Sequence, residues 1–305
     1  MSQNTANDRV AQIAAHLAAV GPSLKDKVCI VTGAGSIFGI GRATVYALAQ
    51  RGPKVIYATD LGLDGLEDLT KDVQAKYPGV QVIPRAVNAA KTSDITGIID
   101  DAVSKFGRLD VFFANAGIAT GNSLQAEDEE SFMTMMRINA LSLTYLYIIC
   151  IHSAFLACRY AGPAMQITGK GGKDRSGGSI ICTASVAGIR SGAGSPEYSA
   201  SKAAVINLCQ TSSFQYAGTD VRVNAMCPGL IETGMTKSTF DYARQKGSAH
   251  KIGQLNPTRR YGVAAEIANV VAFLASDEAS YVNGQAIAVD GGLSASHPVV
   301  PGRFH

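Results

Sequence analysis

The chain has 305 residues, of which 47% are hydrophobic and 17% charged, so it is long and apolar enough to bury one large core. The formal net charge is only +3 and no basic stripe is present, which argues against nucleic-acid binding. Six cysteines without a C-x-x-C pair and five scattered histidines argue against a metal site and favour core thiols in a reducing compartment.

Residues 1–26 form a polar leader with the apolar spacing of a short amphipathic helix. Polar and charged residues interrupt its apolar positions, so it does not read as a signal peptide, and we expect a cytoplasmic protein with no membrane partner. The rest of the chain shows no linker or internal repeat. We therefore predict one domain over residues 27–296 and a C-terminal tail over residues 297–305.

The first predicted strand, residues 27–32, leads into a glycine-rich loop and then a helix over residues 42–50. Such a turn brings backbone N–H groups and a helix N-terminus onto a phosphate group. The loop, residues 33–41, departs from the common G-x-G-x-x-G pattern because Phe38 takes the place of the third glycine. It reads T-G-x5-G-x-G, and we predict that it binds phosphate.

The second predicted strand, residues 54–59, ends at Asp60. An acid at this position can bind both hydroxyls of an adenine ribose and repel a 2′-phosphate, which favours NAD over NADP. A turn or helix-capping role explains Asp60 equally well, and Arg42 is a nearby cation that could accommodate a phosphate. Both interpretations of Asp60 stay open at this point.

Strands and helices alternate along the rest of the chain. This alternation predicts an α/β fold, namely a single-domain, Rossmann-like, doubly wound parallel sheet of about seven strands with helices on both faces. Residues 234–262 have no clear apolar face, and we expect a mobile segment there. The other predicted elements are strands from Val80 towards Asn88 and at 109–113, 179–184, 221–227 and 285–289, with helices at 93–106 and 266–275.

The stretch from Ser185 to Lys202 carries the candidate chemistry. Ser185 follows a predicted strand, and Tyr198 and Lys202 lie four positions apart at the start of a helix, so they project from one face. A nearby ammonium group stabilises a phenolate and lowers the pKa of the phenol towards the range of a useful general acid or base. The spacing Tyr-x-x-x-Lys is common by itself, so the other motifs must decide whether it is functional.

Together, these motifs resemble the short-chain dehydrogenase/reductase family over residues 24–296, nearly the whole chain. Each motif alone is weak, but their order along the chain makes chance a poor explanation. The matching pieces are Thr32-Gly33…Gly39-x-Gly41, Asp60, Asn115-Ala116-Gly117, Asn139, Ser185, Tyr198-x-x-x-Lys202, Pro228-Gly229…Thr233 and Asp290-Gly291-Gly292.

The resemblance implies a role for each matching residue. Tyr198 would be the general acid or base, while Lys202 would lower its pKa and bind the nicotinamide ribose. Ser185 would orient the substrate oxygen, and Asn139 would hold a water molecule that relays protons. The implied cofactor-binding residues are Gly33, Ser36, Ile37, Gly39, Ile40 and Gly41 in the loop, Asp60 and Leu61 at the adenine ribose, Asn88, Asn115, Ala116 and Gly117 on the adenosine side, and Tyr198, Lys202, Ile231 and Thr233 near the nicotinamide.

The sequence departs from the family pattern in three places. The glycine loop is longer by two residues, Ile37 and Phe38, and we expect it to bulge outward. Asn88 stands where the family often has an aspartate, and an amide oxygen can still accept a hydrogen bond from adenine. About eleven residues, Ser142–His152, look inserted in a helix that commonly forms a dimer interface, so they extend or disturb that interface or displace Asn139.

We therefore predict an oxidoreductase that interconverts a secondary alcohol and a ketone with NAD, or alternatively NADP, as a homo-oligomer (dimer or tetramer). The alternatives are a cofactor-binding protein whose turnover is impaired by the insert, and a lyase-like or isomerase-like member of the same scaffold. Residues 234–260 are expected to select a moderately apolar small molecule, such as a cyclic alcohol, quinol or polyketide-like ketone. The leader and the glycine loop resemble fungal members, which suggests secondary metabolism.

Overall fold

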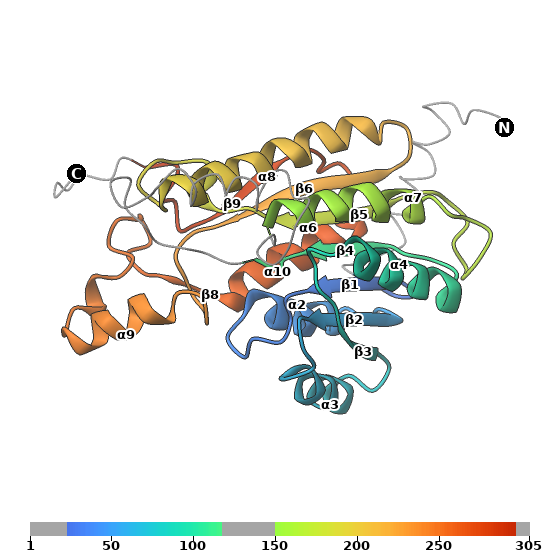
Figure 1. The fold of residues 1–305 in the computed structure, drawn as a ribbon, viewed down its shortest axis with the longest axis horizontal. Coiled ribbons are helices and arrows are strands. Elements are labelled where there is room, and N and C mark those ends of the chain that lie inside the picture. The colour runs from blue at the N-terminus through green and yellow to red at the C-terminus, as the bar shows by residue number, and fades with distance from the viewer. Residues whose placement is uncertain (1–22, 118–149, 297–305) are drawn as a thin grey trace.

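A parallel sheet of seven strands forms the centre of the molecule, as predicted (Figure 1). The computed structural model describes residues 23–117 and 150–296. The strand order is β3-β2-β1-β4-β5-β6-β9, and each neighbouring pair is parallel. The strands are β1 (Val28–Thr32), β2 (Val55–Asp60), β3 (Gln81–Ala86), β4 (Val111–Ala114), β5 (Gly178–Thr183), β6 (Val221–Pro228) and β9 (Ala286–Val289).

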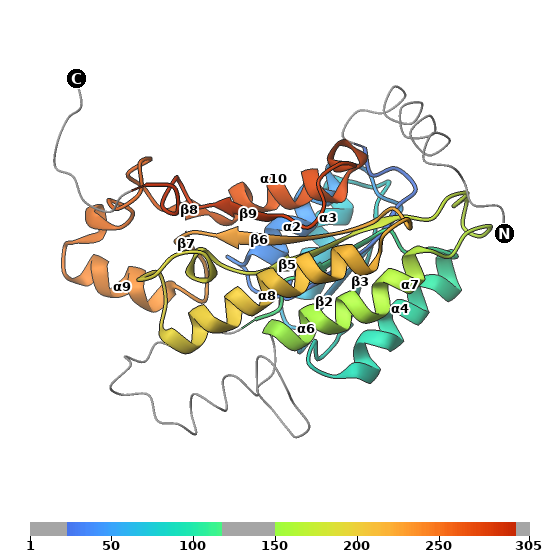
Figure 2. The same ribbon diagram turned by 90° about the horizontal axis from the view of Figure 1, so that it is seen from above.

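Helices cover both faces of the sheet, which confirms the doubly wound architecture (Figure 2). Helices α2, α3 and α10 pack on one face, and α4, α6 and α8 pack on the other. A π-helical turn and the short α7 follow α6. The helices are α2 (Ile40–Ala49), α3 (Leu66–Lys76), α4 (Thr92–Phe106), α6 (Cys150–Leu156), η1 (Ala157–Ala161), α7 (Gly162–Met165), α8 (Pro196–Gln215) and α10 (Ala264–Ala275).

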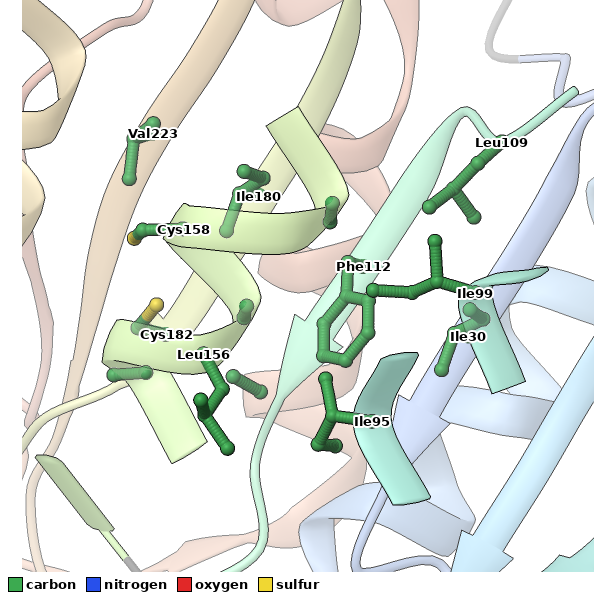
Figure 3. Close-up of a cluster of buried hydrophobic side chains, with 14 of the residues drawn as sticks. Ile30, Ile95, Ile99, Leu109, Phe112, Leu156, Cys158, Ile180, Cys182 and Val223 are labelled. Carbon is green, nitrogen blue, oxygen red and sulfur yellow. The ribbon is translucent and has the colours of Figure 1, made fainter. Parts of the chain in front are cut away.

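The apolar runs form strands that are buried on both faces, because successive side chains of a strand point to opposite sides. In β1, Val28 and Ile30 belong to one core cluster, whereas Cys29 and Val31 belong to the other. Figure 3 shows part of the first cluster, in which Phe112 of β4 lies between residues of α4 and of the α6–η1 segment. This two-sided burial fixes the sheet, and so the positions of the loops at its carboxyl edge.

The segment after β6 is more regular than the sequence indicated. We found no clear apolar face in residues 234–262 and expected a mobile segment, and helix α9 (Lys237–Gln245) lies within them. Its buried residues are Phe240 and Ala243, and the Phe240 ring packs edge-on against Tyr261 at 4.8 Å between centroids. Two buried residues three positions apart are too few to give an apolar face that is visible in the sequence, so the helix was not predicted. A small two-stranded sheet, β7 (Ile231–Glu232) with β8 (Gly262–Val263), closes the base of this segment.

Some predictions fall outside the described residues. Asn139, most of the leader and residues 142–149 of the suggested insert lie there, and the described part of that insert begins α6. The core nevertheless extends into the predicted leader, because Leu24 is fully buried against the α2, α3 and α10 layer. Within the described ranges, no helix is long and apolar enough to cross a membrane.

Candidate active site

A cavity of about 570 Å³ opens at the carboxyl edge of the sheet. Its lining includes Thr32, Asp60, Thr183 and Pro228, the last residues of β1, β2, β5 and β6. The strand order reverses between β1 and β4, and open α/β sheets bind ligands outside the carboxyl ends of the strands at such a switch point. Sheet topology and cavity therefore point to the same place.

The glycine loop forms one wall of this cavity. Gly33 has a φ of 70°, and a Cβ atom placed on Gly41 would lie 2.1 Å from the carbonyl oxygen of Gly33, so neither position accepts a larger residue without strain. Helix α2 begins after Gly39, which has no side chain to cap it. The first N–H groups of α2 therefore remain suited to an anion such as a phosphate.

The two extra residues of the loop lie at the tip of a turn. The N–H of Gly39 donates to the carbonyl of Ser36 at 2.9 Å, and Ile37 and Phe38 between them are 70% and 67% exposed. The loop thus bulges outward, as expected. Of the predicted loop residues, Gly33, Ser36, Gly39 and Ile40 line the cavity, whereas Ile37 and Gly41 do not.

Asp60 has a structural role and also faces the cavity. Its Oδ2 accepts from the N–H of Gly35 and its Oδ1 from the N–H of Leu61, both at 2.8 Å. Its carboxylate shapes the glycine loop and still lines the cavity beside Leu61, so the two interpretations of the sequence are compatible. Arg42 donates through Nη1 to the carbonyl of Gly65 at 2.9 Å, which ties it to the start of α3.

Asn88 does not reach the cavity wall. Its Oδ1 accepts from the N–H of Ala90 at 2.9 Å and so shapes the turn that follows β3. Its neighbours Val87 and Ala89 line the cavity instead. The binding of adenine by Asn88 stays a prediction.

Asn115 joins the ends of three strands around the cavity. Its Nδ2 donates to the carbonyl oxygens of Thr32 at 3.1 Å and Gly33 at 3.2 Å, and its Oδ1 accepts from the hydroxyl of Thr183 at 3.2 Å. The hydroxyl oxygen of Thr32 accepts in turn from the N–H groups of Asn115 and Ala116. This network fixes the turn at Asn115, Ala116 and Gly117, all of which line the cavity.

Ser185, Tyr198 and Lys202 meet at the other end of the cavity. Lys202 is only 4% exposed, and its Nζ donates to the carbonyl of Thr183 at 2.9 Å and lies 5.5 Å from the centre of the Tyr198 ring. The half-buried Tyr198 stands in the first turn of α8, one helical turn before Lys202. The ammonium group is thus held near the phenol by the end of β5.

Ser185 is positioned by the short 3-10 helix η2 (Val186–Gly188), of which it is the N-cap. Its hydroxyl oxygen accepts from the N–H of Ala187 at 3.1 Å, which orients the group while its hydrogen can donate to a substrate oxygen. Burial raises the pKa of the adjacent Cys227 thiol to about 12, so this cysteine stays protonated beside the site. In the described parts of the chain, no cluster of His, Cys, Asp and Glu side chains could hold a metal ion.

Ile231 and Thr233, which are expected near the nicotinamide, also line the cavity, together with residues that were not assigned a role in the site. Most of these additional lining residues are direct neighbours of predicted positions at the ends of strands. The end of each predicted strand could therefore have pointed to them. Thr32, Pro228 and Gly229 stand in the matching motifs without an assigned role, and residues 234–236 fall in the segment expected to select the substrate. The lining residues that the sequence analysis missed are Val87, Ala89, Thr183 and Ala184.

Comparison with known proteins finds relatives that match nearly the whole chain. A family model described as "Enoyl-(Acyl carrier protein) reductase" matches residues 33–294. The 3-oxoacyl-(acyl-carrier-protein) reductase FabG of Thermotoga maritima is 37% identical over 88% of this chain and 98% of its own length. The crystal structure of levodione reductase is 33% identical, covers 90% of this chain and all of its own, and superposes with a TM-score of 0.76. L-sorbose reductase from Gluconobacter frateurii, solved with NADPH and L-sorbose, is 26% identical over 90% of this chain and 98% of its own, with a TM-score of 0.76.

Proposed function

The chain belongs to the short-chain dehydrogenase/reductase family of NAD(P)-dependent enzymes that act on CH–OH groups, and we propose that Tyr198, Lys202, Ser185 and Asn139 catalyse its interconversion of a secondary alcohol and a ketone. The observation that carries this proposal is the position of Lys202, 2.9 Å from the carbonyl of Thr183 and 5.5 Å from the centre of the Tyr198 ring. A buried ammonium group at this place can stabilise the negative charge that develops on the phenol oxygen during proton transfer.

The nicotinamide ring, when bound, donates or accepts the hydride. In the direction of reduction, the Tyr198 hydroxyl donates its proton to the ketone oxygen, and in the reverse direction the phenolate accepts it. Ser185 donates a hydrogen bond to the same oxygen and holds it within reach of Tyr198. The role of Asn139, a water-mediated proton relay, is carried over from the family resemblance alone.

The cavity suits a dinucleotide, and we propose that NAD is preferred over NADP. Gly33 and Gly41 approach each other closely and carry no side chains, so backbone lies exposed next to the N-terminus of α2. A pyrophosphate can approach the N–H groups there. The Asp60 carboxylate lines the cavity at the end of β2, so a 2′-phosphate beside it would meet a like charge. Arg42, which could offset that charge, is engaged with the carbonyl of Gly65.

We propose a neutral, moderately apolar substrate. Among the described residues that line the cavity, the charged ones are Asp60 and Lys202, which serve the cofactor and the catalytic group. Two cations of the α9 segment face acidic partners, since Lys237 contacts Asp241 and Arg244 contacts Glu232. The wall after β7 offers Met235 and Thr236 rather than a cation for a carboxylate.

Titration of the purified protein with NADH and NADPH, followed by fluorescence, tests the proposal together with an assay on a panel of neutral alcohols and ketones. We expect tighter binding of NADH and measurable hydride transfer. Binding without transfer would favour the alternative in which the Ser142–His152 segment impairs turnover. Binding of neither cofactor would contradict the proposal altogether.

The sequence further leads us to propose a homo-oligomer, a cytoplasmic location and a role in secondary metabolism. Light scattering of the purified protein tests the first of these directly. A monomer at assay concentration with full activity would contradict it.

A further inference from the structure

The loop between Ser185 and Tyr198 is anchored at both ends by close backbone contacts. A Cβ atom on Gly188 would lie 2.6 Å from the backbone carbon of Lys202, so this end of the loop lies directly against α8. A Cβ atom on Gly194 would lie 2.9 Å from Cδ1 of Tyr198, so the other end touches the catalytic ring. Any shift of the loop between these points is therefore transmitted to the catalytic side chains.

The middle of this loop is fastened by one long side chain. The partly buried Arg190 donates through Nη1 to the carbonyl oxygen of Leu293, which lies 103 positions further along the chain. A guanidinium group donating to a carbonyl is a charge-assisted hydrogen bond and is stronger than a neutral one. The backbone N–H of Arg190 donates to Val186 at 2.9 Å, so the residue is fixed at both its backbone and its side chain.

The acceptor, Leu293, belongs to a well-ordered turn after β9. Asp290 accepts from the N–H of Gly292 at 2.9 Å and from the N–H of Ser294 at 2.7 Å. Although burial opposes its ionisation, the side chain of Ser294 and these N–H donors hold the pKa of Asp290 below its usual range, so the carboxylate stays charged and keeps the turn closed. Arg190 thus donates to a turn that is itself held by hydrogen bonds.

The same turn touches the two other loops around the nicotinamide end of the cavity. A Cβ atom on Gly229, which follows β6 and lines the cavity, would lie 2.7 Å from Cα of Asp290. The N–H of Thr258, in the return limb of the α9 segment, donates to the carbonyl of Gly291 at 3.3 Å. The turn of residues 290–294 therefore connects the loop after β6 with the segment that is expected to select the substrate.

We propose that Arg190 is a positioning residue that locks the Ser185–Tyr198 loop to the turn of residues 290–294 and thereby sets the substrate side of the active site. The inference rests on the proposed function, because the loop carries the groups that hold the substrate oxygen. The glycine loop and Asp60 lie at the other end of the cavity and do not depend on this contact. Loss of the contact should therefore impair the use of substrate and spare the binding of cofactor.

The test compares Arg190→Met, Arg190→Lys and a matched control, Arg175→Met. Arg175 lies in the loop before β5, at the opposite edge of the sheet, with its guanidinium 4.0 Å from Asp277. We expect Arg190→Met to lower kcat/KM for the alcohol or ketone by about tenfold or more, since small misplacements of reacting groups have large effects on rate. The dissociation constant for NADH should change by less than about twofold, because the proposed contacts with the pyrophosphate and the adenine ribose lie at the far end of the cavity.

The conservative variant should separate a positioning role from a general loss of structure. Arg190→Lys keeps a cation that can donate to Leu293, so its kcat/KM should fall between those of the wild type and Arg190→Met. Arg175→Met should behave like the wild type. A tenfold loss of NADH affinity in Arg190→Met, or equal activity in all four proteins, would overturn the proposal.

Amide hydrogen exchange gives a readout that does not depend on catalysis. The amides of Arg190, Leu293, Ser294 and Ala295 donate hydrogen bonds in and beside the proposed lock, and their exchange should accelerate in Arg190→Met alone. If the wild type shows no hydride transfer, the proposed function fails and exchange still decides whether the lock exists. Unchanged exchange in these segments would overturn the lock even if activity were lost.

Discussion

Two buried lysines lie at opposite edges of the sheet, and their surroundings differ. Lys202 donates to the carbonyl of Thr183 at the carboxyl end of β5, beside the Tyr198 ring and the cavity. Lys173 is 6% exposed and donates to the carbonyl oxygens of Leu109, Met165 and Gly177, which precede β4 or β5. Its ammonium also lies 3.5 Å from the carboxylate of Asp110.

The difference shows why burial of a charge does not identify a functional residue. Asp110 accepts two hydrogen bonds from Arg108 and one from the N–H of Val28. The polar groups around Lys173 therefore form their hydrogen bonds with other groups of the protein. Burial lowers the pKa of Lys173 to about 8, although the neighbouring Asp110 opposes this shift. Lys202, in contrast, stands beside a phenol that borders an open cavity. A lysine that faces a cavity is suited to catalysis, and one enclosed by carbonyl oxygens is suited to holding loops together.

The largest effect is expected at the phenol next to Lys202. Tyr198→Phe removes the proton donor, and we expect kcat to fall by about 10⁴-fold, the upper range for general acid–base catalysis. NADH binding measured by fluorescence should change little, because the ring remains. Tyr281→Phe, at a fully exposed site, is the matched control. Substantial turnover by Tyr198→Phe would refute the assignment of Tyr198 as acid and base.

The lysine at the carboxyl edge should affect rate more than stability. In Lys202→Met the phenolate of Tyr198 loses its neighbouring cation, so kcat/KM should fall by about 10³-fold. The urea midpoint of unfolding should move little, because a methionine of similar volume fills the space. The initial rate of alcohol oxidation at neutral pH, compared between the variant and the wild type, checks the mechanism. A normal rate at neutral pH would contradict the proposed role.

The lysine at the amino edge should show the opposite behaviour. Lys173→Met removes the donor that three carbonyl oxygens share and takes one cation away from Asp110, so we expect a loss of about 3 kcal/mol in the free energy of unfolding. Urea denaturation measures this loss. Per folded molecule, kcat should stay within about twofold of the wild type, because the cluster is remote from the cavity. If kcat fell as far as in Lys202→Met, Lys173 would not have the purely structural role proposed for it.

The smallest effect concerns the choice of cofactor. Asp60→Asn removes the charge next to a 2′-phosphate but keeps an oxygen that can accept from Gly35 or Leu61. We expect the ratio of NADPH to NADH affinity to rise by about tenfold, which corresponds to about 1.4 kcal/mol. Titration of both cofactors measures it. An unchanged ratio would assign Asp60 to the shape of the loop alone.

Much of the site could be predicted because it depends on local sequence. The spacing of Tyr198 and Lys202 places them on one face of a helix wherever that helix packs. The backbone geometry that requires glycines in the loop lies within nine residues: a Cβ atom built on Gly41 would lie 2.1 Å from the carbonyl oxygen of Gly33. The alternation of apolar strands and helices was likewise enough for the parallel, doubly wound sheet.

Other features were decided only when distant segments came together. Nothing in the loop around Lys173 indicates a buried cation, because its partners at Leu109 and Met165 belong to other elements. Helix α9 buries too few residues to produce a recognisable apolar pattern in the sequence. Asn88 accepts a hydrogen bond within its own loop, although its position in the chain suggested a contact with the cavity. Arg190 and Leu293 illustrate the general reason: local patterns specify elements and their faces, whereas contacts between loops more than 100 positions apart depend on how the whole sheet is assembled.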